Sequence, residues 1–477
     1  MKQAPPLSTM PNQASNKLID KTELWAQEEL LALWPRSASR NGQDDSQTGP
    51  DSLGATGIQI DSRLVKAGDL FVPLSAPWAQ RDGHDFIAGA LEAGANVHFC
   101  AQPPQMTSRG IAVPDTFDAL NELATASVKR ALSAKRVALT GSSGKTTLRA
   151  WLEHALGDQC KLHASAGSFN NHLGVPLSLA RMPRDTELGV FEIGTNHPGE
   201  IGPLSKLVNP DLAIVLNVLP VHIGHFEHFN ALVQEKLSIA GGVEAGTLLC
   251  PAAFRHAVRA KSGVRVLTFG TSADADFTLA FERDGIHFTV TSDEESFQGS
   301  APASGATYQE TAAVTLIAAQ LLGFSTEAAA RNLASAEMPA GRGVVIKEGG
   351  ITLIDDSYNA NPTSMKAAID RLSAIQDGRK IAILGEMYEL GDEAPRAHAD
   401  IASAVNMLDQ VVMVGEGFSP FAASAMASFA TNASDIDLPA LAASLREGDT
   451  VLVKGSNGVF WKHQFIQRLV DAIKTSR

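Results

Sequence analysis

Short apolar segments separated by amphipathic segments recur along most of the 477-residue chain. In its middle part the apolar runs are continuous, as in strands that a parallel sheet buries on both faces. These runs are VALTG, GVFEIG (189–194), AIVLNV (213–218), TLLCP (247–251) and VRVLTFG (264–270). FTLAFERDGIHFTVTS alternates around an Asp-Gly pair, which predicts a hairpin. A helix is expected at TAAVTLIAAQLLGF.

The same alternation of strands and helices appears on both sides of this middle part. GIQI, DLFVPL, NVHFC and GIAVP precede it, and ITLIDDS, KIAILGEM, QVVMVGEG and TVLVKGS follow it. The pattern predicts an α/β protein of three domains: a small α/β domain, a central parallel-sheet domain, and a doubly wound, Rossmann-like domain. We place them at residues 23–133, 134–338 and 339–477, after a disordered leader at 1–22.

Composition and charge narrow the class of protein. The formal net charge of −13 argues against a nucleic-acid partner, which calls for a basic groove. Cys100, Cys160 and Cys250 lie far apart and form neither a disulfide framework nor a zinc spacing. No apolar stretch approaches the ~18 residues that a membrane span needs, and MKQAPPLSTMPNQASNK has no apolar core. We expect a cytoplasmic, monomeric protein that does not enter a membrane.

Candidate chemistry begins at VALTGSSGKTT, residues 137–147. Gly141 and Gly144 permit a tight turn whose N–H groups hold an anion at the start of a helix. Lys145 would reach the terminal phosphates of ATP, and the Thr146 hydroxyl would bind Mg²⁺. The strict phosphate-loop pattern fails at Leu139, where it has a glycine, and a plain surface turn with a solvated lysine is the alternative.

Further candidates follow downstream, each with a plain structural alternative. Glu192 ends an apolar run, where a second metal ligand is expected, or it is a strand-end carboxylate in water. His222, His225 and His228 have a spacing that a zinc site can use, although Pro220 and Gly224 disfavour a regular helix there. A single functional histidine is the other interpretation. Lys236 on an amphipathic segment is indistinguishable from a solvated lysine.

The acidic pair Asp355-Asp356 ends an apolar run and leads into SYNANPTSMKAAI. Its carboxylates could accept ribose hydroxyls, while Asn359 and Asn361 offer amide groups. Pro362 and Thr363 are expected to begin the next helix. A polar loop that ends in a helix cap accounts for the same residues.

Taken in order, these motifs resemble the Mur ligase family. GSSGKTT, SFNNHLGVP (168–176), FEIGTNHPGEI (191–201), GRG (341–343), DDSYNANPTSM (355–365), LGEMYELG (384–391) and VLVKGS (451–456) carry the resemblance, with IDSRLVKAGDLFVPL (60–74) near the N-terminus. It covers about residues 55 to 477. The DDSYNANP string is specific to the D-alanyl-D-alanine-adding branch of the family, MurF.

The resemblance implies an activity. A ligase of this branch uses ATP to phosphorylate the terminal carboxylate of UDP-N-acetylmuramoyl-tripeptide, and D-alanyl-D-alanine attacks the acyl phosphate, with two Mg²⁺ ions expected. Such catalysis is mostly positioning and charge neutralisation. By position in the motifs, ATP would contact the loop residues Gly141, Ser142, Ser143, Gly144, Lys145, Thr146 and Thr147, together with Arg342, Asp356 and Asn359.

The same comparison implies roles for the remaining residues. Thr146 and Glu192 would hold the first Mg²⁺, and His222 the second. Lys236 matches a lysine that is carbamylated in several Mur ligases, which makes it a metal ligand. The expected catalytic groups are thus Lys145, Glu192, His222, Lys236 and Arg342. Ser62, Arg63, Asn170, Asn171 and His172 match segments near the UDP-sugar.

Some positions depart from the family pattern. Thr307, Tyr308 and Thr311 replace the polar residues expected near adenine, and Gly385-Glu386-Met387 replaces a Gly-Asp-Met. Two rival functions fit parts of the same pattern. One is another amide-forming ligase of the superfamily, such as the diaminopimelate- or lysine-adding ligase MurE or a folylpolyglutamate synthetase, and the other is a nucleotide-switch protein without ligase chemistry. The sequence leaves open whether the tripeptide carries diaminopimelate or lysine.

Overall fold

A computed structural model describes residues 23–35, 53–75, 81–102, 105–219, 226, 228–421 and 427–477. The predicted leader, residues 1–22, lies outside this part. The chain divides into two compact units. One comprises Met1–Lys135 and Lys161–Phe191, and the other Arg136–Cys160 and Glu192–Arg477. Because the units interleave along the sequence, the predicted domain boundaries stay a prediction.

The first unit contains a four-stranded parallel sheet in the order β1-β2-β3-β4. Its elements are α1 (Gln27–Leu33), β1 (Gly57–Gln59), β2 (Asp69–Phe71), α2 (Ile87–Glu92), β3 (Val97–Cys100), β4 (Gly110–Ala112), α3 (Thr116–Arg130), β6 (Leu162–Ala164) and α5 (Gly174–Ala180). The indole N–H of Trp25 donates to the Ala180 carbonyl at 2.8 Å, and the Arg130 guanidinium lies 3.7 Å from its ring centroid. These contacts bring α3 and α5 to the N-terminal segment.

The central sheet has nine strands in the order β13-β12-β11-β10-β9-β8-β5-β7-β6. Its further elements are β5 (Lys135–Thr140), α4 (Lys145–Leu156), β7 (Leu188–Glu192), α6 (Ile201–Val208), β8 (Leu212–Val215), α7 (Phe229–Leu237), β9 (Thr247–Pro251), β10 (Arg265–Gly270), β11 (Phe277–Phe281), β12 (His287–Thr291), β13 (Ser296–Ser300), α8 (Ala306–Leu321) and α9 (Thr326–Leu333). Strands β8, β9 and β10 are parallel and buried, as their apolar runs predict.

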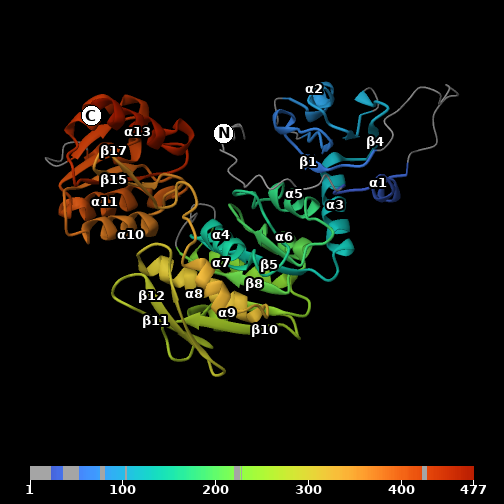
Figure 1. The fold of residues 1–477 in the computed structure, drawn as a ribbon, viewed down its shortest axis with the longest axis horizontal. Helices are drawn as coiled ribbons and strands as arrows, with labels where there is room; N and C mark the ends of the chain where they lie inside the picture. The colour runs from blue at the N-terminus through green and yellow to red at the C-terminus, as the bar shows by residue number, and fades with distance from the viewer. Residues whose placement is uncertain are drawn as a thin grey trace. The chain divides into compact units, whose positions relative to one another are not determined.

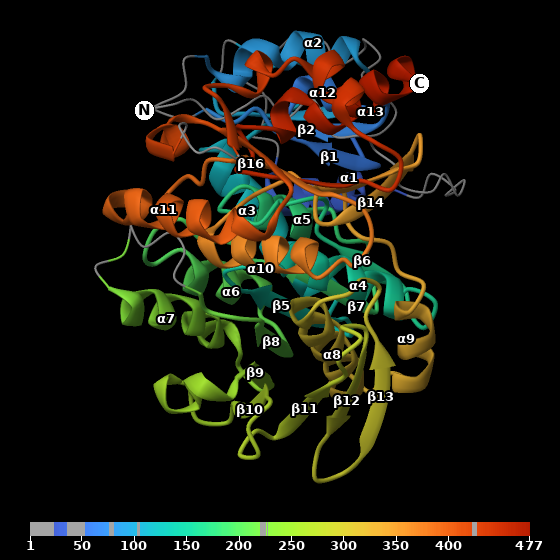
Figure 2. The same ribbon diagram turned by 90° about the vertical axis from the view of Figure 1, so that its left-hand side faces the viewer.

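Strands β11 and β12 form the predicted antiparallel hairpin. Helices α8 and α9 lie against this end of the sheet, which Figure 1 and Figure 2 show in yellow and orange. Helix α8 also packs on α4. Helix α4 begins directly after the glycine loop of residues 141–144.

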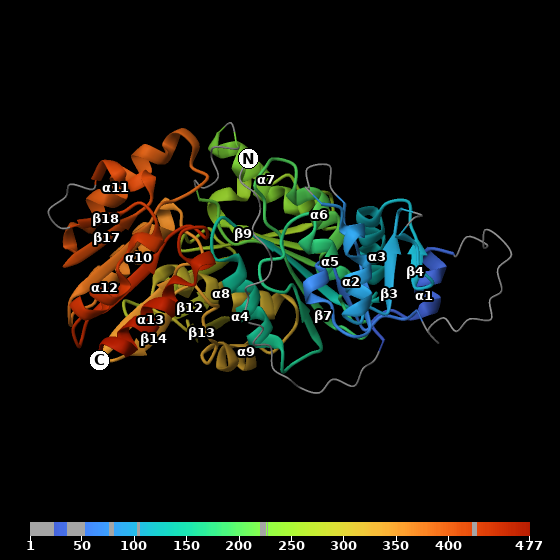
Figure 3. The same ribbon diagram turned by 90° about the horizontal axis from the view of Figure 1, so that it is seen from above.

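The C-terminal sheet has the order β14-β15-β19-β16-β17-β18, with β14 antiparallel to its neighbour. Its elements are β14 (Val344–Glu348), β15 (Ile351–Asp356), α10 (Pro362–Ser373), β16 (Lys380–Gly385), α11 (Ala394–Ala404), β17 (Gln410–Val414), β18 (Ala427–Ala430), α12 (Leu438–Ser444), β19 (Thr450–Lys454) and α13 (Phe465–Ser476). Helices α10 and α11 share one apolar core with the sheet, and α12 and α13 share another (Figure 3). The doubly wound prediction is therefore confirmed.

Four strands were not predicted: β6, β13, β14 and β18. Strand β13 is SFQGS, whose residues are all at least partly exposed, so neither apolar alternation nor an apolar run marks it. Among the described helices, none has both the length and the apolar composition needed to cross a bilayer.

Candidate active site

The phosphate loop lies between β5 and α4, as the apolar run and the helical pattern predict. Gly144 has a φ of 78°, a left-handed conformation that glycine adopts without strain. A Cβ on Gly144 would lie 2.8 Å from Cδ2 of Leu216, so a side chain there would also require the Leu216 side chain to move. Leu139 belongs to the buried strand β5, and the loop itself begins at Gly141.

Asn217, which the sequence motifs do not single out, holds the loop in shape. Its side-chain Oδ1 accepts hydrogen bonds from the N–H groups of Ser142 and Ser143, both at 3.0 Å. Its Nδ2 donates to the Ser143 carbonyl at 3.1 Å. The available signal was a polar residue just after the buried strand β8, at the edge of the sheet where ligands bind.

Thr146 and Glu192, the two predicted ligands of one metal ion, lie side by side. The Thr146 hydroxyl donates to Oε2 of Glu192 at 2.8 Å, and the two residues are 6% and 1% exposed. Lys145 precedes Thr146, and its Nζ donates to the Gly141 carbonyl at 2.8 Å. Burial lowers the pKa of Lys145, the negative charge of Glu192 opposes this, and the positive charge of Arg342 adds to the lowering.

Lys236 is buried near this group, not solvated, with 1% of its surface exposed. Burial and then the positive charge of Lys145 hold the pKa of Lys236 well below its usual value, against the opposing charges of Glu235 and Glu200. The Glu235 carboxylate accepts from the N–H groups of Gly199, Glu200 and Ile201 at 2.7, 3.0 and 2.8 Å. Helix α7, which carries Lys236, is thereby fixed to the start of α6.

The C-terminal candidates have internal partners. Asp356 accepts from Nζ of Lys454 at 2.8 Å and lies 3.7 Å from Arg371. Nζ of Lys454 also donates to the Asn359 carbonyl at 3.1 Å, and Lys454 is 3% exposed. Asn361 caps α10, which begins at Pro362 as predicted. The cap therefore accounts for Asn361. The Asp356 carboxylate lies beside two cationic side chains, those of Lys454 and Arg371.

Three protein-family models match consecutive parts of the chain: "Mur ligase family, catalytic domain" at 55–138, "Mur ligase middle domain" at 139–319, and "Mur ligase, glutamate ligase domain" at 341–457. The UDP-N-acetylmuramoyl-tripeptide–D-alanyl-D-alanine ligase of Bacillus subtilis (strain 168) is 32% identical over 421 residues, which cover 84% of this chain and 91% of that protein. The chain belongs to the Mur ligase family. This assignment confirms the resemblance, and it makes the chain an ATP-dependent, ADP-forming ligase.

Solved structures of Mur ligases have the same fold. MurF from Acinetobacter baumannii superposes with a TM-score of 0.80 at 27% identity, covering 95% of this chain and all of that one. MurF from Thermotoga maritima, solved in complex with ADP, has a TM-score of 0.74 at 27% identity, over 88% of this chain and 97% of that one. These similarities confirm the predicted three-domain α/β fold class for this Mur ligase.

The predicted sugar-side residues of this Mur ligase lie in its first unit. Asp61 caps the turn that begins at Ser62 and binds the Arg63 guanidinium at 2.9 and 2.6 Å. Oδ1 of Asn171 accepts from the Leu173 and Gly174 N–H groups, and the exposed His172 ring lies edge-on to Phe117 at 6.0 Å. Asn170 precedes them in the same segment. Their proposed contacts with a UDP-sugar stay predictions.

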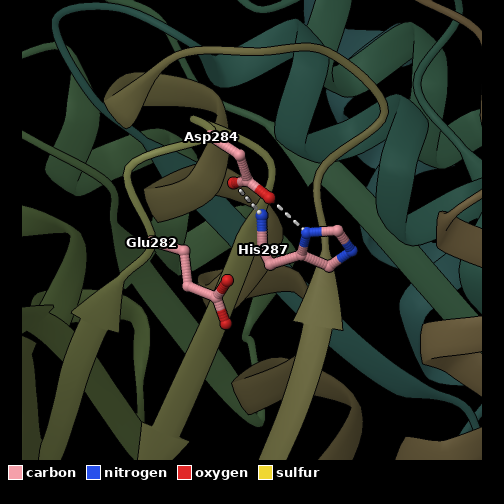
Figure 4. Close-up of side chains that lie close together, drawn as sticks. All are labelled: Glu282, Asp284 and His287. Atoms are coloured by element: carbon pink, nitrogen blue, oxygen red, sulfur yellow. Dashed lines mark hydrogen bonds and ion pairs between the residues drawn. The ribbon is translucent and has the colours of Figure 1, made fainter.

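The zinc interpretation of the histidine segment stays a prediction. His222 and His225 lie outside the described residues, and Nδ1 of His228 accepts from the Ala231 N–H to cap α7. A different group, Glu282, Asp284 and His287, meets at the exposed turn between β11 and β12 (Figure 4). Oδ1 of Asp284 accepts from the N–H groups of Ile286 and His287, and Oδ2 bonds the His287 ring. The turn itself therefore accounts for this group.

Proposed function

We propose that this Mur ligase joins D-alanyl-D-alanine to UDP-N-acetylmuramoyl-tripeptide in cytoplasmic peptidoglycan-precursor synthesis. The observation that carries the proposal is the similarity to the D-alanyl-D-alanine ligase of Bacillus subtilis, with 32% identity over 84% of this chain. The phosphate loop and the Thr146–Glu192 pair supply the matching chemistry.

The reaction proceeds in two steps. A carboxylate oxygen of the tripeptide attacks the γ-phosphorus of ATP, and ADP leaves. The amine of D-alanyl-D-alanine then attacks the acyl carbon; phosphate leaves, the nitrogen loses a proton, and an amide remains. Lys145 and the N–H groups at the start of α4, which Asn217 does not occupy, bind the phosphates, and Arg342 adds positive charge as negative charge moves to the leaving oxygen.

Thr146 and Glu192 fit a Mg²⁺ site, because both offer oxygen atoms, the ligands this ion prefers. The two side chains are buried, and the Thr146 hydroxyl donates to the Glu192 carboxylate. In the proposal they hold one Mg²⁺, while His222 and Lys236 hold a second. Ions held there would neutralise charge on the phosphates. Asp356 and Asn359 lie toward the ribose, and Ser62, Arg63, Asn170, Asn171 and His172 toward the UDP-sugar.

Lys236 becomes a metal ligand in this proposal only as a carbamate. Its lowered pKa leaves more of the amine neutral, which is the form that attacks CO₂. The new N–C bond forms with loss of a proton, and the side chain then carries one negative charge. Full activity in a Lys236→Ala variant would remove this part of the proposal.

The test is ADP and phosphate release by the full-length enzyme with ATP, Mg²⁺ and UDP-N-acetylmuramoyl-tripeptide. Parallel reactions contain D-alanyl-D-alanine, meso-diaminopimelate or glutamate as acceptor. Turnover with D-alanyl-D-alanine supports the proposal. Turnover only with another acceptor would transfer the chain to a different branch of the family, and none with any acceptor would contradict the ligase proposal. The molecular mass of the enzyme, measured in solution under the assay conditions, shows whether it works as a monomer.

A further inference from the structure

Two of the chain's three tyrosines, which lie in different segments of the second unit, contact Arg342. Tyr308 on α8 donates its hydroxyl to the main-chain carbonyl of Arg342 at 3.3 Å. Tyr358, which follows β15, lies under the guanidinium, whose Cζ is 4.3 Å from its ring centroid. One tyrosine thus contacts the backbone of Arg342 and the other its charged group.

The backbone around Arg342 fits closely against Tyr308. Gly343 has a φ of 94°, and a Cβ on it would lie 2.5 Å from the Tyr308 hydroxyl oxygen. The Gly343 N–H donates to the Asp355 carbonyl at 2.7 Å, and the Arg342 N–H to the Pro339 carbonyl at 3.1 Å. The Tyr308 hydroxyl therefore contacts a turn whose N–H groups, at Arg342 and Gly343, both donate hydrogen bonds.

Tyr308 is itself held in place. Its ring lies 6.2 Å from that of Trp151 on α4, and the Arg371 guanidinium lies 4.7 Å from its centroid. Burial raises the pKa of Tyr308, so the hydroxyl keeps its proton and remains a donor. Because α4 begins at Lys145, contacts lead from the phosphate-binding helix through Tyr308 to the turn of Arg342.

We infer that Tyr308 is a positioning residue for Arg342. Its hydroxyl sets the place of the Arg342 main chain relative to α4, and the Tyr358 ring sets the direction of the guanidinium. The arginine then meets the transferring phosphoryl group together with Lys145. This inference rests on the role of Arg342 in the proposed function, and it assigns a use to the tyrosine that departs from the family pattern.

A double-mutant cycle tests the inference, because a residue that acts through Arg342 has no effect once Arg342 is gone. The four full-length proteins are wild type, Tyr308→Phe, Arg342→Ala and the double variant. Phenylalanine keeps the ring beside Trp151 and Arg371 and removes only the hydroxyl. We expect Tyr308→Phe to lower kcat about 10-fold in the wild-type background, and less than about twofold in the Arg342→Ala background, with KM for both peptide substrates unchanged.

Equal losses in the two backgrounds would mean a merely structural role and overturn the inference, as would a wild-type kcat in Tyr308→Phe. The same cycle measured on the dissociation constant of ATP needs no acceptor. There we expect about threefold weaker binding in the wild-type background and no change beside Arg342→Ala. Failure of the proposed function appears separately, as a wild-type enzyme that does not turn over D-alanyl-D-alanine; the cycle is then decided on ATP binding.

Discussion

The Thr146 hydroxyl donates a 2.8 Å hydrogen bond to the Glu192 carboxylate, although 46 residues separate the two in sequence. Thr146 stands in the first turn of α4, and Glu192 is the last residue of β7. A buried carboxylate needs a partner, and here its partner is the other predicted ligand of the same ion. The contact that packs the loop against β7 therefore also joins the two predicted metal ligands.

Thr146→Ala is expected to lower kcat by about 100-fold, since it removes a predicted metal ligand and the hydroxyl that donates to Glu192. It should also raise the Mg²⁺ concentration needed for half-maximal activity. The measurement is ADP release across a Mg²⁺ titration. Thr146→Ser retains the hydroxyl and serves as the matched control, with a rate close to wild type. An Ala variant with the wild-type Mg²⁺ dependence would contradict this prediction.

Asn217→Ala is expected to disorder the phosphate loop, because three hydrogen bonds to Ser142 and Ser143 are lost. The KM for ATP should rise about 10-fold, and the free energy of unfolding should fall by about 2 kcal/mol. Steady-state kinetics and chemical denaturation measure the two effects. The control is Asn406→Ala, at an exposed side chain whose amide donates to the Ser403 carbonyl. If both variants behave alike, Asn217 has no special place in the loop.

Lys236→Met is expected to abolish turnover and at the same time to stabilise the protein, because an amine that burial disfavours is replaced by an apolar side chain of similar length. The pKa of Lys236 is lower in the folded state than in the unfolded state. At pH values between these two pKa values, the unfolded chain therefore binds more protons than the folded chain. The wild-type free energy of unfolding therefore rises with pH across this window. Consequently the stabilisation by methionine is larger at pH 7 than at pH 10. Thermal unfolding in bicarbonate-free buffer at several pH values measures it; a difference that stays constant with pH would refute the role of the buried amine.

Asp284→Asn is expected to lower the pKa of His287 and to leave turnover unchanged. The hydrogen bond from the His287 ring to Asp284 raises the pKa of His287. The same bond, together with the N–H groups of Ile286 and His287, lowers the pKa of Asp284 to about 2. An NMR titration of the histidine ring protons compares the two proteins. The same spectra with added Zn²⁺ check whether the turn binds metal: shifts at micromolar zinc would show a site that the turn geometry does not require.

The sequence predicts the strands that are apolar throughout and the residues whose chemistry depends on local order. The loop from Gly141 to Thr147 is one example, since a strand, two glycines and a helix start all lie within eleven residues. Strands β13 and β14 escape prediction because all their residues are at least partly exposed, so no buried apolar pattern marks them. Pairing across a sheet is a tertiary property.

The candidate site follows the same division. Lys145, Thr146 and Glu192 are found from motif and strand end, whereas Asn217 acts through contacts with a loop 74 and 75 residues away. Lys236 is a second residue, whose burial in the site cannot be predicted from the sequence pattern. Its helix has ordinary amphipathic spacing, yet Lys236 is buried, beside a Glu235 that binds the start of α6. Only the folded arrangement separates it from a solvated lysine.

The interleaving of the two units has a consequence for synthesis of the chain. Lys161–Phe191 belongs with the residues before 135, while Arg136–Cys160, which contains the phosphate loop, belongs with the C-terminal part. When the ribosome has synthesised the chain up to residue 160, the residues of the phosphate loop are present but neither unit is complete. The first unit can complete its fold only after Phe191 has left the ribosome. The phosphate loop can reach its final structure only later, once β8 and the other strands of its sheet have been synthesised. No single cut in the gene separates the two units into intact fragments.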